Sequence, residues 1–393
     1  MDFTHTEEQR ALRDAARRLA EDRFAARAFS WDGFPWENAK VLAKAGFTGI
    51  TIPVADGGQG GTLMDAVLVM DAVSQVCPNS GDAVQATNFG AIRQVAAFGS
   101  ARVKRDVLPA LLAGDGLISA GMSEPEAGSA LTELRTRARY DGGDVVLDGQ
   151  KIWSSYAPEI THSVIWARFG PRSRDIGCVV VPADAPGFAK GPQQTYLSGE
   201  HHAALYLDEC RVPADYVLAD SDALRRMFTI FGIERVGNAT RALALAQAAF
   251  DRAVEHAKNR RQFGRPLCEF QGLQWRFADM KMKLEAARLL IYRAVQNADD
   301  GAPSPADASL AKCFANEVAF EVANQAMQVF GASGYSTDLP MEYFMRRTRG
   351  WMIAGGSVEM MRNRIAEDIF GRSFSQRPPE RPPALAVDGS TVL

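Results

Sequence analysis

Residues 224–262 read LRRMFTIFGIERVGNATRALALAQAAFDRAVEHAKNRRQ, a run of helical periodicity without a proline. Its apolar and small residues recur every three to four positions, which predicts one long amphipathic helix. Two further runs with this period follow at 269–298 and 305–331. Helices of this length usually pack side by side and antiparallel. The sequence therefore predicts a C-terminal four-helix bundle over residues 223–372.

The residues before this bundle show two different sequence patterns. Residues 4–113 keep helical periodicity, interrupted by the turn-rich segment AGFTGITIPVADGGQGG, and predict an N-terminal helical domain over 1–115. Short runs rich in Val, Ile, Trp and Tyr, such as GCVVVPA, then predict a small antiparallel, barrel-like β domain over 116–222. The fold class is thus α+β, and the polar, proline-rich end at 373–393 is expected to be disordered.

Composition excludes several classes of function. Hydrophobic residues make up 47% and charged residues 23% of the 393 residues, with a formal net charge of −3, so we expect no general attraction to nucleic acid. The cysteines have no metal-ligand or disulfide spacing, and the histidines form no metal or triad pattern, with His201 and His202 expected in a surface loop. No apolar run approaches a membrane helix or a signal peptide, so we expect a cytoplasmic location.

Five short sequence words stand out within this organisation. They are MSEPEAGSA at 122–130, DGQKIWSSYA at 148–157, RRQFGRPLCEFQ at 260–271, QVFGASGY at 328–335 and GGSVEMMRNRIA at 355–366. Together, in this order and spacing, they resemble the signatures of the acyl-CoA dehydrogenase family over residues 1–371. The resemblance implies a flavoprotein that binds FAD between the β domain and the bundle and oxidises an acyl thioester between its α and β carbons.

By this resemblance, the first two words form the flavin side of the site. The backbone near Met122 and the Ser123 hydroxyl are implied to hydrogen-bond the flavin ring, and Ser129 to lie near the thioester or its pantetheine arm. Trp153 is implied to cover one edge of the flavin, and Ser155 matches the hydroxyl residue that donates to flavin N5. Taken alone, both words are also ordinary turn and strand sequences.

The last three words are implied to hold the rest of the cofactor. Arg260 matches an arginine that reaches the FAD of a neighbouring subunit, where a guanidinium can bind pyrophosphate in a bidentate manner. This implies at least a dimer, and the family is usually a homotetramer. Ser357 is expected to cap the last helix beside the FAD phosphate or ribose. The cofactor-binding residues implied by these words are Arg260, Gln262, Phe263, Gln271, Gln328, Gly331, Ala332, Ser357 and Glu359.

The catalytic base is missing from its commonest position in this family. Many members carry a glutamate at the start of the last word, where this chain has Gly355, which has no side chain to remove a proton. In isovaleryl-CoA dehydrogenase-like members the glutamate comes from the long helix that opens the bundle, just before an arginine. The segment FGIERVG matches that register. Glu234 is therefore the expected base, and Arg235, Ser129 and Gly355 are the expected substrate contacts.

Three alternatives remain open at this point. Ala130 resembles the residue in acyl-CoA desulfinases, which eliminate sulfite and carry glutamine at the position of Glu234, so the acidic residue favours dehydrogenation. A carrier-protein thioester in place of acyl-CoA is a second alternative, and a flavin-binding protein without turnover is a third. Electron-transfer flavoprotein is the implied electron acceptor. Gln85, Asn88 and Phe89 are candidates for the acyl pocket.

Overall fold

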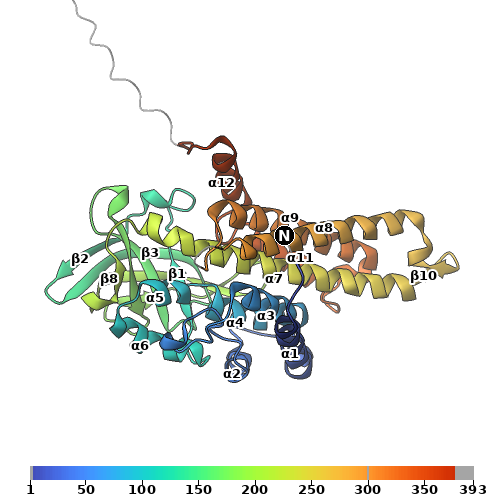
Figure 1. Cartoon of the computed structure of the whole chain (residues 1–393), viewed down its shortest axis with the longest axis horizontal. Helices are drawn as coiled ribbons and strands as arrows, with labels where there is room; N and C mark the ends of the chain where they lie inside the picture. The colour runs from blue at the N-terminus through green and yellow to red at the C-terminus, as the bar shows by residue number, and fades with distance from the viewer. Residues whose placement is uncertain (1–2, 299–300, 377–393) are drawn as a thin grey trace, which may run out of the picture.

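The computed structural model describes residues 3–298 and 301–376, so most of the tail expected to be disordered lies outside the described residues. The chain forms N-terminal helices, a central sheet and a C-terminal group of long helices (Figure 1). The sheet lies at one end of the molecule, and the long helices extend away from it. The predicted α+β class and the order of its parts are confirmed.

The N-terminal helices surround a central, almost fully buried helix. Capping boxes set two of the helix starts: Thr6 pairs with Gln9, and Thr62 pairs with Asp65. The central helix α3 packs against α1, α4 and, from the C-terminal part, α7. The helices are α1 (Glu7–Arg23), α2 (Trp36–Lys44), α3 (Leu63–Val76), α4 (Pro78–Asn88), α5 (Ile92–Phe98), α6 (Ala101–Leu112) and α7 (Ala223–Asn259).

The middle of the chain forms a nine-stranded sheet with the order β6-β8-β3-β2-β4-β5-β9, in which β1 also pairs with β4 and β7 with β8. Most strand pairs are antiparallel, as expected, but β1 and β2 both run parallel to β4, so the sheet is mixed. The strands are β1 (Ile118–Gly121), β2 (Arg137–Asp141), β3 (Asp144–Ser155), β4 (His162–Arg168), β5 (Ile176–Pro182), β6 (Phe188–Lys190), β7 (Gln194–Thr195), β8 (His201–Pro213) and β9 (Val217–Ala219).

The C-terminal part is organised around two long helices that run in the same direction, with Asn238 beside Asn316 and His256 beside Phe330. The first, α7, has 37 residues, and it packs along α9, which also contacts α8, α11 and α12. Ser304 caps α9, and Pro305 occupies its first turn, where no intrahelical N–H bond is lost. The remaining elements are β10 (Arg261–Gln262), β11 (Arg265–Pro266), α8 (Gln271–Gln296), α9 (Pro305–Phe330), α10 (Ala332–Tyr335), α11 (Met341–Trp351) and α12 (Val358–Phe370).

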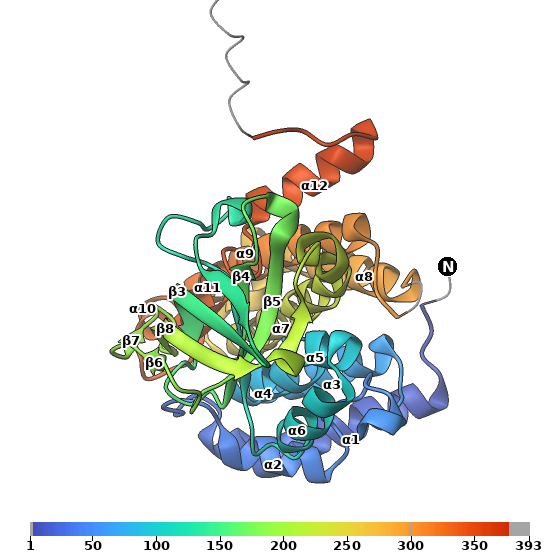
Figure 2. The same ribbon diagram turned by 90° about the vertical axis from the view of Figure 1, so that its left-hand side faces the viewer.

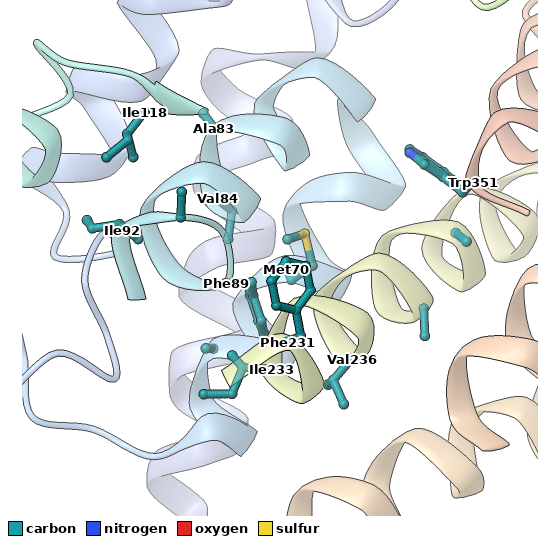
Figure 3. Packing of buried hydrophobic residues seen from close by; sticks show 14 of the residues in the cluster. Met70, Ala83, Val84, Phe89, Ile92, Ile118, Phe231, Ile233, Val236 and Trp351 are labelled. Atoms are coloured by element: carbon teal, nitrogen blue, oxygen red, sulfur yellow. The ribbon is translucent and has the colours of Figure 1, made fainter. Parts of the chain in front are cut away.

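One continuous hydrophobic core joins all three parts. Figure 3 shows Phe89, the residue that follows α4, and Met70 of α3 beside Phe231 of α7. Phe231 also meets Trp166 of β4 edge to face, with the ring centroids 6.1 Å apart. Seen from the sheet end, α3 to α6 lie on one side of the strands and α8, α9 and α12 on the other (Figure 2). The start of α7 is therefore fixed between the sheet and the N-terminal helices.

Candidate active site

Glu234 of α7 and Gly355 of the turn between α11 and α12 lie next to each other. A Cβ atom built on Gly355 would lie 3.8 Å from Glu234 Oε1, 3.7 Å from Asn238 Nδ2 and 3.6 Å from Lys312 Cε. Gly355 and Gly356 have φ angles of +70° and +89°, which favour glycine. The carboxylate of Glu234 thus lies beside the place from which a side chain at position 355 would start.

Burial raises the pKa of Glu234 above its ordinary value. The positive charges of Arg241, Arg235 and Lys312 oppose this effect without cancelling it. Arg235 is buried, and burial lowers its pKa to about 10. A carboxyl group with a raised pKa is a better proton acceptor than an ordinary one, so long as it is ionised at the working pH.

Lys312 of α9 is a site residue that sequence reasoning missed. Its side chain is completely buried, and its Nζ donates to the carbonyl oxygens of Trp351 (3.2 Å) and Gly356 (2.8 Å). Burial lowers its pKa to about 8. Asn316, one turn later, donates to the same Trp351 carbonyl at 2.6 Å. These two side chains of α9 hold the glycine turn against Glu234. The available signal was a lysine inside the alanine-rich run ASLAKCFA.

Replacing Lys312 by methionine is expected to move the ionisation of the Glu234 carboxyl to higher pH, measured as the pH profile of its infrared carboxyl band. The substitution removes a positive charge near Glu234, so the pKa of this carboxyl rises further. It also leaves the Gly356 carbonyl without this donor, at a cost of about 1–3 kcal/mol in stability. Asn316→Leu loosens the same turn without changing charge, and it should lower stability while leaving the pH profile in place. A similar pH shift in both variants would contradict a specific effect of the Lys312 charge.

The first two sequence words come together where the turn after β1 packs against the end of β3. The Ile152 N–H donates to Ser123 O at 2.9 Å, which joins the MSEP turn to β3. Trp153 has a φ of +62° and is 58% exposed. Tyr196, which donates to Trp153 O at 3.1 Å, stacks on His202 with ring centroids 4.1 Å apart. Met122, Ser123, Trp153 and Ser155 thus lie around an aromatic surface that sequence reasoning did not predict.

A buried ion pair supports this surface from within the sheet. Lys151 Nζ lies 2.7 Å from Glu124 Oε1 and 3.3 Å from Met122 O. Glu124 also accepts from the backbone N–H groups of Arg135 at 2.5 Å and Thr136 at 3.0 Å. Burial raises the pKa of Glu124, but Lys151 and these hydrogen bonds outweigh it, so the pKa is lowered overall. The pair connects the two words that are implied to hold the flavin.

Other implied cofactor residues lie at the opposite end of the long helices. Arg260 ends α7, and Phe263, in the hairpin of β10 and β11, is 94% exposed. Phe330, at the end of α9, stacks on His256 of α7 with centroids 4.1 Å apart, which places QVFGASGY at this same end. Figure 1 shows β10 at the end of the bundle far from the sheet. Within one chain, the predicted cofactor residues therefore form two separate groups. One group lies near the sheet, and the other lies at the far end of the long helices; this second group is Arg260, Gln262, Phe263, Gln271, Gln328, Gly331 and Ala332.

The remaining predicted residues have clear positions. Ser357 caps α12 by accepting from the Met360 N–H, and it also lowers the pKa of the exposed Glu359 carboxyl. Ser129 is exposed in the loop after β1. The expectation of a surface loop for His201 and His202 is wrong, because both belong to β8 and His202 is buried. The strand-like run AALYLDECRVP at 203–213 thus begins two residues earlier in the structure than its sequence pattern indicates.

The chain was compared with known families, and each part of it matched. Residues 6–115 match the acyl-CoA dehydrogenase N-terminal domain, 119–210 the middle domain and 224–370 the C-terminal domain. A probable acyl-CoA dehydrogenase of Mycobacterium leprae is 35% identical over 369 residues, which are 92% of this chain and 95% of that protein. The chain belongs to the acyl-CoA dehydrogenase family. This family consists of FAD-dependent oxidoreductases, and the exposed aromatic surface beside Ser123 and Ser155 fits a flat flavin ring.

Two further likenesses within the acyl-CoA dehydrogenase family bear on the reaction. A 3-sulfinopropanoyl-CoA desulfinase of Paraburkholderia xenovorans is 36% identical over 386 residues, covering 95% of this chain and 99% of that protein. The structure of butyryl-CoA dehydrogenase from Megasphaera elsdenii superposes with a TM-score of 0.89 at 28% identity, over 94% of this chain and 100% of that one. The relatives thus include both oxidative and desulfinating enzymes.

The sequence predicts no disulfide, no metal site and no membrane-spanning helix. All five cysteines are free thiols. Among residues 3–298 and 301–376, no group of His, Cys, Asp and Glu is arranged to hold a metal ion. Within the same residues, no helix combines the length and the apolar character needed to cross a bilayer.

Proposed function

We propose that this protein catalyses the α,β-dehydrogenation of an acyl-CoA thioester, with Glu234 removing the α proton. The observation that carries the proposal is the position of the Glu234 carboxylate, 3.8 Å from the Cβ position of Gly355. The turn that lacks a catalytic side chain thus receives one from α7. The raised pKa of Glu234 suits a general base. FAD, when bound, accepts the hydride from the β carbon.

The other site residues are assigned binding roles in this proposal. Met122, Ser123, Trp153 and Ser155 hold the flavin ring at the end of β3, while Ser357 and Glu359 lie at the start of α12 for the phosphate or ribose. Arg235 and Ser129 contact the thioester and its arm. Because the group around Arg260 lies at the far end of the same chain, we assign it to the FAD of a neighbouring copy in a homotetramer.

Anaerobic titration of the FAD-loaded protein with butyryl-CoA tests the proposal. We expect loss of the flavin absorbance in proportion to added substrate and its return when electron-transfer flavoprotein is added. The same acyl group on an acyl-carrier protein should bleach the flavin more slowly if CoA is the natural carrier. If no acyl thioester of either kind reduces the flavin, dehydrogenation is excluded.

A desulfinase-like elimination is the second candidate, and the named desulfinase relatives favour it. The acidic side chain at Glu234 supports dehydrogenation instead, because oxidation requires removal of an α proton. The two functions differ in their products. Release of sulfite from 3-sulfinopropanoyl-CoA without any electron acceptor, combined with no flavin reduction by butyryl-CoA, would establish elimination as the reaction.

A further inference from the structure

One buried carboxylate, that of Asp82 in α4, joins three distant parts of the chain. Asp82 is 5% exposed. Its Oδ1 atom accepts a hydrogen bond from Arg241 of α7 at 2.9 Å, and its Oδ2 atom accepts one from the Tyr156 hydroxyl at 2.6 Å. The same carboxylate pairs with Arg347 of α11. A single side chain thus connects the end of β3, the helix that carries Glu234 and the helix that leads into the glycine turn.

On the sheet side, this carboxylate anchors the segment that carries Ser155. Trp153 and Tyr156, on either side of this serine, have φ angles of +62° and +54°. A bulky residue rarely adopts this conformation, which persists where surrounding contacts hold it. The Tyr156 N–H donates to His201 O at 2.8 Å, and its hydroxyl donates to Asp82. Burial raises the pKa of this hydroxyl well above its ordinary value, so it remains a hydrogen-bond donor.

On the bundle side, the same carboxylate anchors the surroundings of Glu234. Arg241 lies two helical turns after Glu234 on α7, and among the neighbouring charges it opposes the raised pKa of Glu234 most strongly. The guanidinium groups of Arg241 and Arg347 both lie over the Trp351 ring, at 4.8 and 5.1 Å from its centroid. The Trp351 carbonyl in turn accepts the hydrogen bonds from α9 that hold the glycine turn. Asp82 therefore fixes both the helix of the base and the turn that faces it.

The charges in this cluster balance one another. Arg347 also pairs with Glu200, so two guanidinium groups face two carboxylates without a ligand ion; the four residues are Asp82, Glu200, Arg241 and Arg347. The function of the cluster therefore depends on what it holds in place. Removal of a proton and of a hydride from adjacent carbons requires the base and the flavin to face the substrate together. A misplacement of about 1 Å can cost about a hundredfold in rate.

We propose that Asp82 is a positioning residue, which fixes the Glu234 carboxylate relative to Ser155 and so to the flavin ring. Asp82 acts through Tyr156 on one side and through Arg241 on the other, and it contacts neither the substrate nor the cofactor. The proposal rests on the function proposed above, because it takes Glu234 as the base and Ser155 as a flavin contact. It adds the residue that aligns these two groups, which lie on different parts of the fold.

The Tyr156→Phe variant of the FAD-loaded protein tests this proposal, because it removes one hydroxyl from the cluster and leaves the ring packed edge to face against Phe34. We expect the visible absorption and circular dichroism bands of the bound flavin to shift, since the segment of Ser155 is no longer fixed. Stopped-flow reduction by butyryl-CoA should slow by about ten- to a hundredfold. The dissociation constant, obtained from the dependence of this rate on butyryl-CoA concentration, should change by about twofold or less, because the contacts to the thioester remain. Asp82→Asn loosens both sides of the cluster and should slow reduction further.

Tyr216→Phe is the matched control. Tyr216, in the turn after β8, also reaches an N-terminal helix through a tyrosine–aspartate hydrogen bond, to Asp106 of α6 at 3.2 Å. This bond lies outside the cluster around Asp82. The control should lose some stability in urea and keep both the flavin bands and the reduction rate of the unmodified protein.

The proposal is overturned if Tyr156→Phe keeps the flavin bands and the reduction rate of the control. Slower reduction with equally weaker butyryl-CoA binding also overturns it, because a general loosening of the fold would produce that result. If no thioester reduces the flavin of the unmodified protein, the proposed dehydrogenase function fails instead. The flavin bands of Tyr156→Phe need no substrate, so they still decide whether this cluster positions the segment of Ser155.

Discussion

Replacing Glu234 by glutamine is expected to slow anaerobic flavin reduction by an acyl-CoA by about a thousandfold. Glutamine has nearly the same size and keeps FAD in place, but it cannot accept the α proton. The protein should therefore retain its flavin absorbance on isolation and lose only the bleaching by substrate. Stopped-flow absorbance at the flavin band gives the rate directly. A variant that bleaches at the rate of the unmodified protein would show that the base lies elsewhere.

The pH dependence of this pair of proteins follows from the raised pKa of Glu234. Since the base must be ionised, the rate of the unmodified protein should rise with pH through a value above the ordinary glutamate pKa. The folded state favours the protonated carboxyl, so ionising it costs stability as the pH rises. Glu234→Gln should thus be the more stable protein at neutral pH and lose this advantage in acid. Glu255→Gln, at an exposed position of the same helix, is the matched control and should change neither property.

Replacing Lys151 by methionine is expected to lower the free energy of unfolding by about 3–5 kcal/mol, because it leaves the buried Glu124 carboxylate without its cation. The MSEP turn also loses the hydrogen bond from Lys151 to Met122 O. The variant should therefore retain less FAD, measured as the ratio of flavin to protein absorbance. Urea unfolding of the FAD-loaded protein measures the stability change.

Two controls separate this buried pair from surface ion pairs. Adding Glu124→Gln to Lys151→Met should recover part of the lost stability, since no buried charge is then left unpaired. Lys104→Met breaks a more exposed pair with Asp56 and should cost about 1 kcal/mol or less.

Burial lowers the pKa of Lys151 from 10.5 to about 8, so between these values the unfolded chain binds more protons than the folded one. The unmodified protein should gain stability relative to Lys151→Met over this range. Equal losses for Lys104→Met and Lys151→Met would contradict the buried-pair interpretation.

The order of helices, sheet and helices was predictable because hydrophobic periodicity records which face of each element is buried. The run at 224–262 shows this well: its small residues pack against α9, and the predicted helix coincides with α7 apart from its ends. The parallel pairing of β1 with β4 was not predictable. The residue pattern shows where strands occur. It does not show which strands pair when they are far apart in the sequence, because that depends on the path of the chain between them.

The candidate site was predictable only where a residue belongs to a recognisable sequence word. Glu234 was found in this way, by its position before Arg235. Lys312 was not assigned a role, because its importance comes from the carbonyl groups of a turn some forty residues later. Gln85 was named only as a candidate for the acyl pocket, and its contact with Gly237 was not predicted. Neither partner can be read from the local sequence. Such contacts depend on the packing of distant helices.

Gly237 limits how far the helix α7 can change. A Cβ atom at this position would lie 2.3 Å from Gln85 Oε1 and 2.5 Å from Phe89 Cγ, so α4 and α7 pack with their backbones close together here. Glu234 lies one helical turn before this contact on the same helix. A larger residue at position 237 would therefore displace α7 and carry the Glu234 carboxylate away from the glycine turn.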